Sequence, residues 1–306
     1  MTLRVTFLGT SGAVPTARRN PSGIYVNREG EELLFDCGEG TQRQMMRFGT
    51  GFSISAILLT HVHGDHVLGL PGLLQTLDFN DRAEPLTIHT PRGTRRTVEK
   101  LVGALDARLG FPVEVREVGP GEAVHEGEEY GIRTFRTDHR TRSVGYALVE
   151  SDRKGRFDRE RAEELGVPVG PEFGRLHAGE AVELADGTVI EPEQVVGEPR
   201  PGRRVVYTGD TRPTEETVEA AEDADLLIHD ATFGDDWAER AGETGHATAR
   251  EAGEIADRAG AKRLALTHIS SRYAGDASRL AREANEEFED AFVAEDGREI
   301  EVPFPG

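Results

Sequence analysis

Three histidines and one aspartate lie within the six residues from His61 to His66, which read His-Val-His-Gly-Asp-His. Imidazole and carboxylate groups are ligands that suit a divalent metal of the zinc type. Their side chains can converge in so short a segment only if the chain turns sharply, and Gly64 permits such a turn. The cluster therefore predicts a metal site that includes His61, His63, Asp65 and His66. A solvated polar loop is the alternative.

The cluster follows a strand-like apolar segment, 56–60, and four similar segments also end at a histidine or an aspartate. These segments are 131–137, 204–208, 225–229 and 263–267, and the polar residues at their ends are His139, Asp210, His229 with Asp230, and His268. Ligands at strand ends that come from distant parts of a chain meet along one rim of a sheet sandwich. We therefore expect these side chains to lie close together.

A hydrolytic site with two metals needs about seven protein ligands, one of them a bridging carboxylate. The candidates divide into two sets that share Asp210: His61, His63, His139 and Asp210 for one metal, and Asp65, His66, Asp210 and His268 for the other. Two metals about 3.5–4 Å apart lower the pKa of a water molecule between them and stabilise charge on an attacked phosphoryl oxygen. Asp65 is placed to receive the proton of that water.

Composition limits both the type of metal site and the environment of the protein. Cys37 is the only cysteine of the 306 residues, which excludes an intrachain disulfide and a thiolate-rich zinc site. The chain has 36 basic and 56 acidic residues, a net charge of −20, and only three lysines. Such a composition is typical of halophilic archaea and predicts a protein that works in concentrated salt. Screening there acts within a few ångströms, so the negative charge does not exclude a nucleic-acid partner.

The elements alternate in a mixed α/β pattern within a single domain, 1–306. Helices are predicted at 70–77, 92–109, 214–222, 248–259 and 276–288. Segment 151–203, rich in glycine, proline and charge, is predicted to be an inserted, projecting arm, or alternatively a mobile loop. The chain has no apolar run of 18 residues and no signal-like first segment, so we expect a cytoplasmic protein that does not enter a membrane.

The order of the predicted ligands, HxHxDH followed by an isolated histidine, an aspartate and a final histidine, resembles the metallo-β-lactamase superfamily. Segments 7–12, 35–41, 229–233 and 267–273 are similar to one branch, the ribonuclease Z family, and the resemblance spans nearly the whole chain. It implies an αββα sandwich of two mixed sheets with helices on the outer faces. It also implies two Zn²⁺ ions per subunit, with Mn²⁺ or Fe²⁺ as alternatives. The implied reaction removes the 3′ trailer from precursor transfer RNA, cutting 3′ of the discriminator nucleotide and leaving a 3′-hydroxyl.

The resemblance also implies roles for residues outside the metal cluster. His246-Ala247-Thr248 is similar to the family's His-Ser-Thr element, whose histidine acts near the scissile phosphate as proton donor to the leaving oxygen. His229 is expected to support a metal ligand through a hydrogen bond. The family's arm residues, which grip the transfer RNA, correspond to Gly166, Pro168, Gly170 and Pro171. A homodimer in which the arm of one subunit serves the other active site is also implied.

The loop Pro15–Asn20 resembles the family's loop near the acceptor end of the substrate. Its residues Arg18, Arg19 and Asn20 are expected to bind RNA, but Ala17 stands where the family commonly has a lysine. This departure leaves open how CCA-ended transfer RNA is discriminated.

Two other functions remain open at this stage. One is a small-molecule metallo-hydrolase on the same fold, acting on a phosphodiester, lactone or thioester. The other is an RNA-binding or scaffold protein with a purely structural metal. Structural zinc sites are closed four-coordinate cages, whereas a carboxylate-bridged pair leaves positions open for water and substrate, which favours catalysis.

Overall fold

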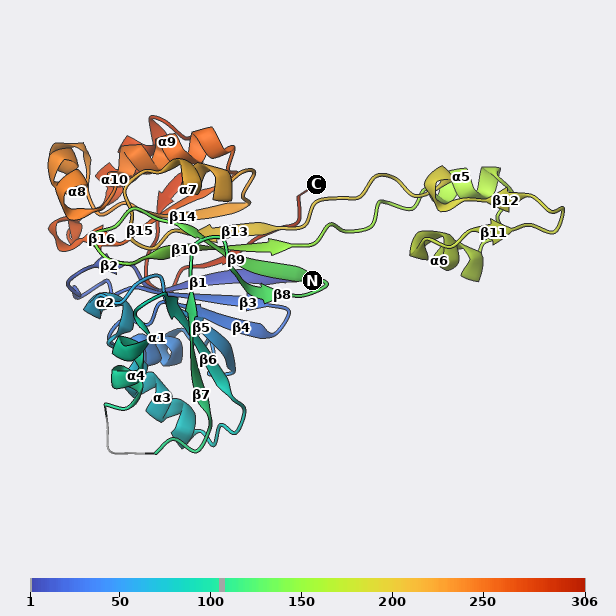
Figure 1. Ribbon diagram of the computed structural model, residues 1–306. Coiled ribbons are helices and arrows are strands. Elements are labelled where there is room, and N and C mark those ends of the chain that lie inside the picture. Colours follow the sequence, from blue (N-terminus) through green and yellow to red (C-terminus); the bar gives the residue numbers. More distant parts are fainter. Residues whose placement is uncertain (1, 105–107, 306) are drawn as a thin grey trace. The chain divides into compact units, whose positions relative to one another are not determined.

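The computed structural model describes residues 2–104 and 108–305 (Figure 1). The chain divides into two compact units. The first comprises Met1–Val149 and Arg204–Pro303, and the second comprises Glu150–Arg203 with the C-terminal segment Phe304–Gly306. The predicted site residues other than those of the arm all belong to the first unit.

The first unit contains two seven-stranded sheets. Sheet order in the first is β18-β1-β3-β4-β5-β6-β7, where β18 to β4 pair antiparallel and β4 to β7 pair parallel. Its strands are β1 (Leu3–Gly9), β3 (Gly23–Arg28), β4 (Glu31–Phe35), β5 (Ile54–Leu58), β6 (Leu86–Pro91), β7 (Val113–Val118) and β18 (Glu299–Glu301).

The second sheet has the order β17-β15-β14-β13-β10-β9-β8. Strands β13, β14, β15 and β17 pair parallel, whereas β10 joins β13 antiparallel and β8 joins β9 antiparallel. Its strands are β8 (Ala123–Glu126), β9 (Tyr130–Arg136), β10 (Val144–Glu150), β13 (Arg204–Tyr207), β14 (Leu226–Asp230), β15 (Leu264–Thr267) and β17 (Ala291–Val293). Strands β2 (Ser11–Gly12) and β16 (Ile269–Ser270) form a separate two-stranded parallel sheet.

Helices cover the outer face of each sheet (Figure 1). The first sheet packs against α1 (Thr41–Phe48), α2 (Gly64–Val67), α3 (Leu70–Phe79) and α4 (Arg95–Val102). The second packs against α7 (Glu215–Ala220), α9 (Ala249–Ala259) and α10 (Ser278–Asn285), and α8 (Ala238–Thr244) precedes α9 in the chain. A third apolar core, which includes Phe35, Tyr146 and Tyr207, lies between the sheets. The predicted αββα sandwich is therefore confirmed.

One predicted helix is too long, and helix α1 is among those that were not predicted. The predicted helix 92–109 is too long, because α4 ends at Val102 with Gly103 as its cap, and glycine is a poor helix former. Residues 105–107 of that prediction lie outside the described residues. Helix α1 was missed because its sequence, Thr-Gln-Arg-Gln-Met-Met-Arg-Phe, is mostly polar, and only one of its apolar side chains, Met45, is fully buried.

The second unit has a core of its own. Helices α5 (Arg159–Glu164) and α6 (Pro171–Ala178), the hairpin β11 (Val182–Glu183) and β12 (Val189–Ile190), and the turn η1 (Pro192–Gln194) form it. Its buried side chains are Ala162, Val167, Leu176, Val182, Ile190 and Val195. At its base, the Arg203 guanidinium forms a two-pronged ion pair with the Glu150 carboxylate, with both N···O distances 2.7 Å. In the described part of the chain, none of the helices is both long and apolar enough to span a bilayer.

Candidate metal centre

The predicted ligands come from loops at strand ends, and the sheet pairing brings these ends together. Strands β13, β14 and β15 are parallel neighbours, so Asp210 and His268, which follow β13 and β15, lie at the same edge of the second sheet. The first sheet contributes its ligands at the loop after β5, where the Thr60 carbonyl accepts a hydrogen bond from the Val144 amide of β10. This bond ties the His61 loop to the second sheet.

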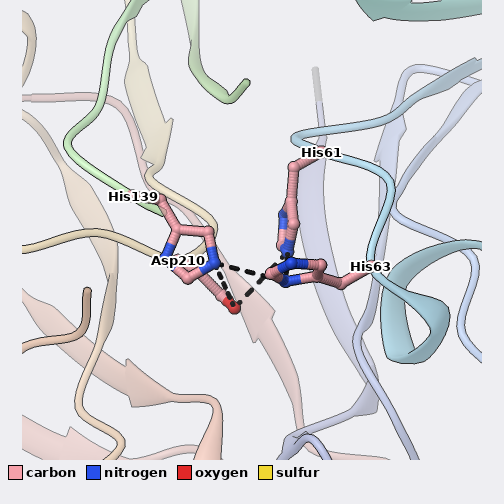
Figure 2. Close-up of side chains that lie close together, drawn as sticks. All are labelled: His61, His63, His139 and Asp210. Atoms are coloured by element: carbon pink, nitrogen blue, oxygen red, sulfur yellow. Dashed lines mark hydrogen bonds and ion pairs between the residues drawn. The ribbon is translucent and has the colours of Figure 1, made fainter. Parts of the chain in front are cut away.

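His61, His63, His139 and Asp210 form one group of converging side chains (Figure 2). The Nε2 atom of His61 lies 3.5 Å from Oδ2 of Asp210 and 3.1 Å from Nδ1 of His63. The Nε2 atom of His139 lies 3.3 Å from the same His63 atom and 3.9 Å from Asp210 Oδ2. The lone pairs of these atoms point toward one small volume, as a first metal would require.

A second group adjoins the first across Asp210. The Nε2 atom of His268 lies 3.2 Å from Oδ2 of Asp65 and 3.3 Å from Oδ2 of Asp210. The Nε2 atom of His66 lies 3.3 Å from the other Asp210 oxygen, Oδ1, and 3.5 Å from Asp65 Oδ2. The Asp210 carboxylate thus lies between the two groups: Oδ2 faces His61, His139 and His268, and Oδ1 faces His66, so the carboxylate is placed to be shared by both. The structure brings all seven predicted ligands together.

Hydrogen bonds at Nδ1 orient four of the five rings. Nδ1 of His139 donates to the Gly245 carbonyl at 2.7 Å, and Nδ1 of His268 donates to the Thr232 hydroxyl at 2.8 Å. Gly245 has φ +83, and a Cβ there would approach His139 Nδ1 to 3.0 Å, so a side chain would be strained in this turn. Because Nδ1 carries the proton in these rings, Nε2 keeps the lone pair that a metal needs.

His61 and His66 are oriented through one buried carboxylate that the sequence analysis missed as a functional residue. Nδ1 of His66 donates to Oδ2 of Asp36 at 2.8 Å. Nδ1 of His61 donates to the Thr60 hydroxyl at 3.0 Å, and that hydroxyl donates to Asp36. The position of Asp36 directly after a buried strand, in a segment already recognised as a motif, was the available signal.

His63 has the opposite orientation, because its Nδ1 atom faces the other ligands. This difference follows from its position, since His63 is the N-cap of the short helix α2 and has an extended backbone, with φ −67 and ψ 154. His268 is also unusual, with φ +60 in a non-glycine residue. Such backbone strain clusters at functional sites, where the surrounding structure maintains it.

Three rings of the cluster are neutral and the carboxylates of Asp65 and Asp210 are ionised, whereas the charges of Asp210 and Asp36 outweigh burial and raise the pKa of His66. Burial lowers the pKa values of His61, His63 and His139, so these rings are neutral at pH 7. Burial alone would raise the pKa of Asp65, but the adjacent His268 ring and the charge of His66 outweigh it and lower that pKa. Neutral imidazole and ionised carboxylate are the forms that bind metal.

Two buried atoms support the fit of a metal to this site. Nε2 of His66 and Oδ1 of Asp210 have no hydrogen-bond partner among the described residues, although both atoms are inaccessible to solvent. An unsatisfied buried polar atom is costly, and a bound cation between these two atoms would satisfy both. The donor set of five imidazoles and two carboxylates is suited to a divalent metal, so the site fits such an ion.

His246 lies beside the cluster and is held by a second buried carboxylate. Its Nδ1 atom donates to Oδ2 of Asp230 at 2.8 Å, and its ring stacks on that of His268 with centroids 5.0 Å apart. Burial lowers the pKa of His246, but the charge of Asp230 outweighs it and raises the pKa to about 9. Asp230 also accepts the Thr211 amide and the Thr232 hydroxyl, so its position is fixed. An alternative set of metal-capable side chains is Asp210, Asp230, His246 and His268.

His229 does not hydrogen-bond a predicted ligand. Its Nδ1 atom donates to the backbone carbonyl of Asp230 at 2.7 Å, and the fully buried Nε2 atom has no partner among the described residues. The hydrogen bonds that support His268 and His139 come instead from Thr232, in the loop after β14, and from Gly245, the C-cap of α8.

The three predicted RNA-binding residues of the Pro15–Asn20 loop differ in their contacts. Arg18 is exposed. Arg19 donates to the Thr10 hydroxyl at 2.7 Å, and the Asn20 amide groups donate to Asp296 and to the Glu39 carbonyl, both at 2.7 Å. Arg19 and Asn20 therefore maintain the loop conformation, whereas the Arg18 side chain is available to a partner.

The four predicted arm residues lie in the turn that joins α5 to α6 and at the start of α6. Gly166, with φ +84, follows the C-cap of α5, and Pro171 is the first residue of α6. Val169, between them, is 63% exposed. The turn presents glycine, proline and an exposed apolar side chain.

Comparisons with known proteins agree with this geometry. A family model described as the metallo-beta-lactamase superfamily matches residues 17–268. Ribonuclease Z of Natronomonas pharaonis is 66% identical over 306 residues, which cover 100% of this chain and 99% of that protein. Ribonuclease Z of Haloferax volcanii is 64% identical, covering 99% and 96%.

Among solved structures, human tRNase Z, short form, matches with a TM-score of 0.72 and 29% identity, covering 98% of this chain and 100% of the human one. A diphosphatase from the PhnP family, with a TM-score of 0.63 and 20% identity, shows the shared fold alone. The high identity to the archaeal proteins over the full length shows the family as well as the fold. The chain is a hydrolase and belongs to the ribonuclease Z family of the metallo-β-lactamase superfamily.

Proposed function

We propose that this protein is a metal-dependent endoribonuclease that removes the 3′ trailer from precursor transfer RNA, cutting 3′ of the discriminator nucleotide. The observation that carries the proposal is the convergence of seven His and Asp side chains, with His246 beside them, in a chain so similar to ribonuclease Z. Two Zn²⁺ ions are the proposed cofactors, and Mn²⁺ or Fe²⁺ suits the same ligands. The products would be a transfer RNA with a 3′-hydroxyl and a trailer with a 5′-phosphate.

In this proposal, His61, His63 and His139 would hold one ion, Asp65, His66 and His268 would hold the other, and Asp210 would be shared by both. When bound, the ions would acidify a water molecule and stabilise negative charge on the phosphoryl group. Asp65 would receive the proton of the attacking water. Its Oδ2 atom is fixed by the Ala13 backbone amide at 2.8 Å, which keeps the carboxylate directed at the cluster.

His246 would complete the reaction. The water oxygen bonds to phosphorus, the bond from phosphorus to the discriminator O3′ breaks, and that oxygen needs a proton to leave as a hydroxyl. The Nδ1 proton of His246 is donated to Asp230, which leaves Nε2 to carry the transferable proton. The raised pKa of about 9 keeps this ring protonated at neutral pH.

The substrate would be bound mainly by residues outside the metal cluster. The exposed Arg18 and the α5–α6 turn of the second unit are the proposed contacts to phosphate and to the shape of the RNA. A homodimer and a cytoplasmic location stay predictions. Light scattering of the purified protein would give the mass of the assembly.

The decisive experiment is incubation of metal-loaded protein with a precursor transfer RNA that carries a 3′ trailer, from low to multimolar KCl, followed by mapping of the product ends. A single cut after the discriminator nucleotide is the expected result. A variant in which residues 152–200 are replaced by a short glycine linker should lose this cleavage yet still hydrolyse bis-p-nitrophenyl phosphate. A protein that hydrolyses this small diester but cuts no precursor at any salt would instead be a small-molecule hydrolase.

A further inference from the structure

Trp237, the only tryptophan of the chain, is a partly exposed aromatic residue near the metal cluster. It ends the turn η2 (Asp235–Trp237), in the segment that joins Asp230 to His246. Its exposed fraction is 40%. An exposed aromatic ring offers a flat face on which a nucleic-acid base can stack.

A guanidinium group covers one part of this indole. Arg272, in the turn η3 (Ser271–Tyr273) after His268, places its Cζ atom 4.6 Å from the Trp237 ring centroid and 5.7 Å from that of Phe233. The Phe233 ring contacts the His246 ring edge to face, with centroids 6.2 Å apart. A continuous row of flat groups thus runs from His246 through Phe233 and Arg272 to Trp237.

The charge of Arg272 is available to a ligand. Within the described residues its guanidinium forms no ion pair, and its one hydrogen bond is to the Ser270 hydroxyl at 3.2 Å. Two of the neighbouring acids are paired, since Asp235 contacts Arg250 at 2.9 Å and Asp236 contacts Arg279 at 3.1 Å, whereas Glu239 is exposed and has no ion pair among the described residues. An approaching anionic strand therefore meets the Arg272 cation beside two compensated carboxylates and one uncompensated carboxylate.

We propose that Trp237 and Arg272 form a stacking platform for one unpaired nucleotide base next to the scissile phosphate. This inference rests on the proposed function, because it supplies the contact that positions the strand for the cut. Aromatic rings and arginine planes both stack on bases without requiring a particular sequence. The base belongs either to the discriminator nucleotide or to the first trailer nucleotide, which share this chemistry.

High salt makes such a contact especially useful to this chain. Phosphate contacts weaken steeply as salt rises, because their affinity comes from counterion release. Stacking depends on contact between flat surfaces and is less sensitive to screening. The composition, with its net charge of −20, predicts work in concentrated salt, where a contact of this second kind would be favoured.

The single tryptophan gives a direct test that needs no cleavage. With metal removed by a chelator, short single-stranded RNA should quench the tryptophan emission saturably, and this quenching should persist into multimolar KCl. A duplex of the same composition should quench little, because its bases are already stacked. Absence of quenching by any single strand would overturn the proposal even if the protein cuts precursor transfer RNA. Quenching without any cleavage would instead leave the platform standing and remove the proposed function.

Kinetics then identify the base. Trp237→Ala should raise KM for the precursor by about fivefold or more, with a smaller effect on kcat, and Trp237→Phe should restore most of the loss. Phe79→Ala, which removes an 87% exposed aromatic from α3, is the matched control and should leave KM unchanged. Precursors with an abasic discriminator or an abasic first trailer nucleotide complete the test. If one of these bases stacks on Trp237, removing it should make the KM of wild type equal to that of Trp237→Ala. A difference in KM that survives removal of either base contradicts the platform.

Discussion

The Asp36 carboxylate joins the His66 imidazole to the Tyr207 hydroxyl at the base of the metal cluster. Its Oδ2 atom accepts from His66 Nδ1 at 2.8 Å and from Tyr207 at 2.9 Å, and its Oδ1 atom accepts the Thr60 amide at 2.8 Å. Asp36 is fully buried and has φ +56, a conformation that aspartate and asparagine tolerate better than most residues. The first sheet thus fixes one ring of the cluster through a residue that does not itself face the metal site.

Asp36→Asn should weaken metal binding by about 10- to 100-fold, the usual cost of losing a carboxylate that supports a metal-bound histidine. Asparagine keeps the size and the backbone conformation but loses the charge that holds the His66 proton on Nδ1. Competition with a chromogenic chelator measures the affinity. Tyr207→Phe removes a different bond to the same carboxylate and should have a smaller effect. Equal affinity of Asp36→Asn and wild type would show that Asp36 is only structural.

Substitution of Asp210 should remove more metal ions from the protein than substitution of His139. The Asp210 carboxylate faces both halves of the cluster, whereas His139 contacts only the half that contains His61 and His63. Asp210→Ala should therefore deplete both ions, and His139→Ala should retain one. Native mass spectrometry with elemental analysis counts them. Retention of two ions by Asp210→Ala would contradict the bridging role.

His246→Ala should slow precursor cleavage by about 10²- to 10⁴-fold, the range for loss of a general acid. A precursor with sulfur in place of the discriminator O3′ tests the reason, because a thiolate leaves without a proton. This substrate should recover most of the rate in His246→Ala but gain little in wild type. A variant equally slow on both substrates would show that His246 acts in another way.

Local patterns in the sequence predicted the mixed α/β class and the clustering of the His and Asp side chains, and the family resemblance supplied the αββα sandwich. Apolar strands with a histidine or aspartate at their ends are visible in the chain, and parallel pairing of β13, β14 and β15 brings such ends together. Ring orientation was not predictable. It depends on partners distant in sequence, such as Gly245 for His139, 106 positions away, and Asp36 for His66.

Other features escaped because their signals were weak or tertiary. Helix α1 buries Met45 from a mostly polar sequence. Arg19, and not Arg18, hydrogen-bonds the Thr10 hydroxyl, and the sequence does not show which of two adjacent arginines makes such a bond. The small core of segment 150–203 is formed by single apolar residues that are spaced too widely to read as a strand or helix face.

Replacing Arg203 should destabilise the second unit selectively. Its guanidinium and the Glu150 carboxylate are both buried, so Arg203→Met leaves a buried charge without its main partner, at a cost of about 3–5 kcal/mol. Hydrogen exchange should increase in segment 150–203 and remain low in the two sheets. Arg240→Met, which removes an exposed ion pair with Glu243, is the control and should change little. Unchanged exchange in Arg203→Met would show that the pair does not support this unit.

Stability should rise with salt, because a net charge of −20 disfavours the compact state through self-repulsion. Screening shortens from about 10 Å at 0.1 M salt to about 3 Å at 1 M, which removes most of this repulsion. Measuring Tm at increasing KCl concentrations tests this expectation, and sucrose serves as an uncharged control solute. Glu219, Glu239 and Glu254 are exposed and form no ion pair in the described part of the chain. Changing all three to glutamine should raise Tm at low salt and flatten its dependence on KCl. A wild-type Tm that is highest at low ionic strength would refute adaptation to concentrated salt.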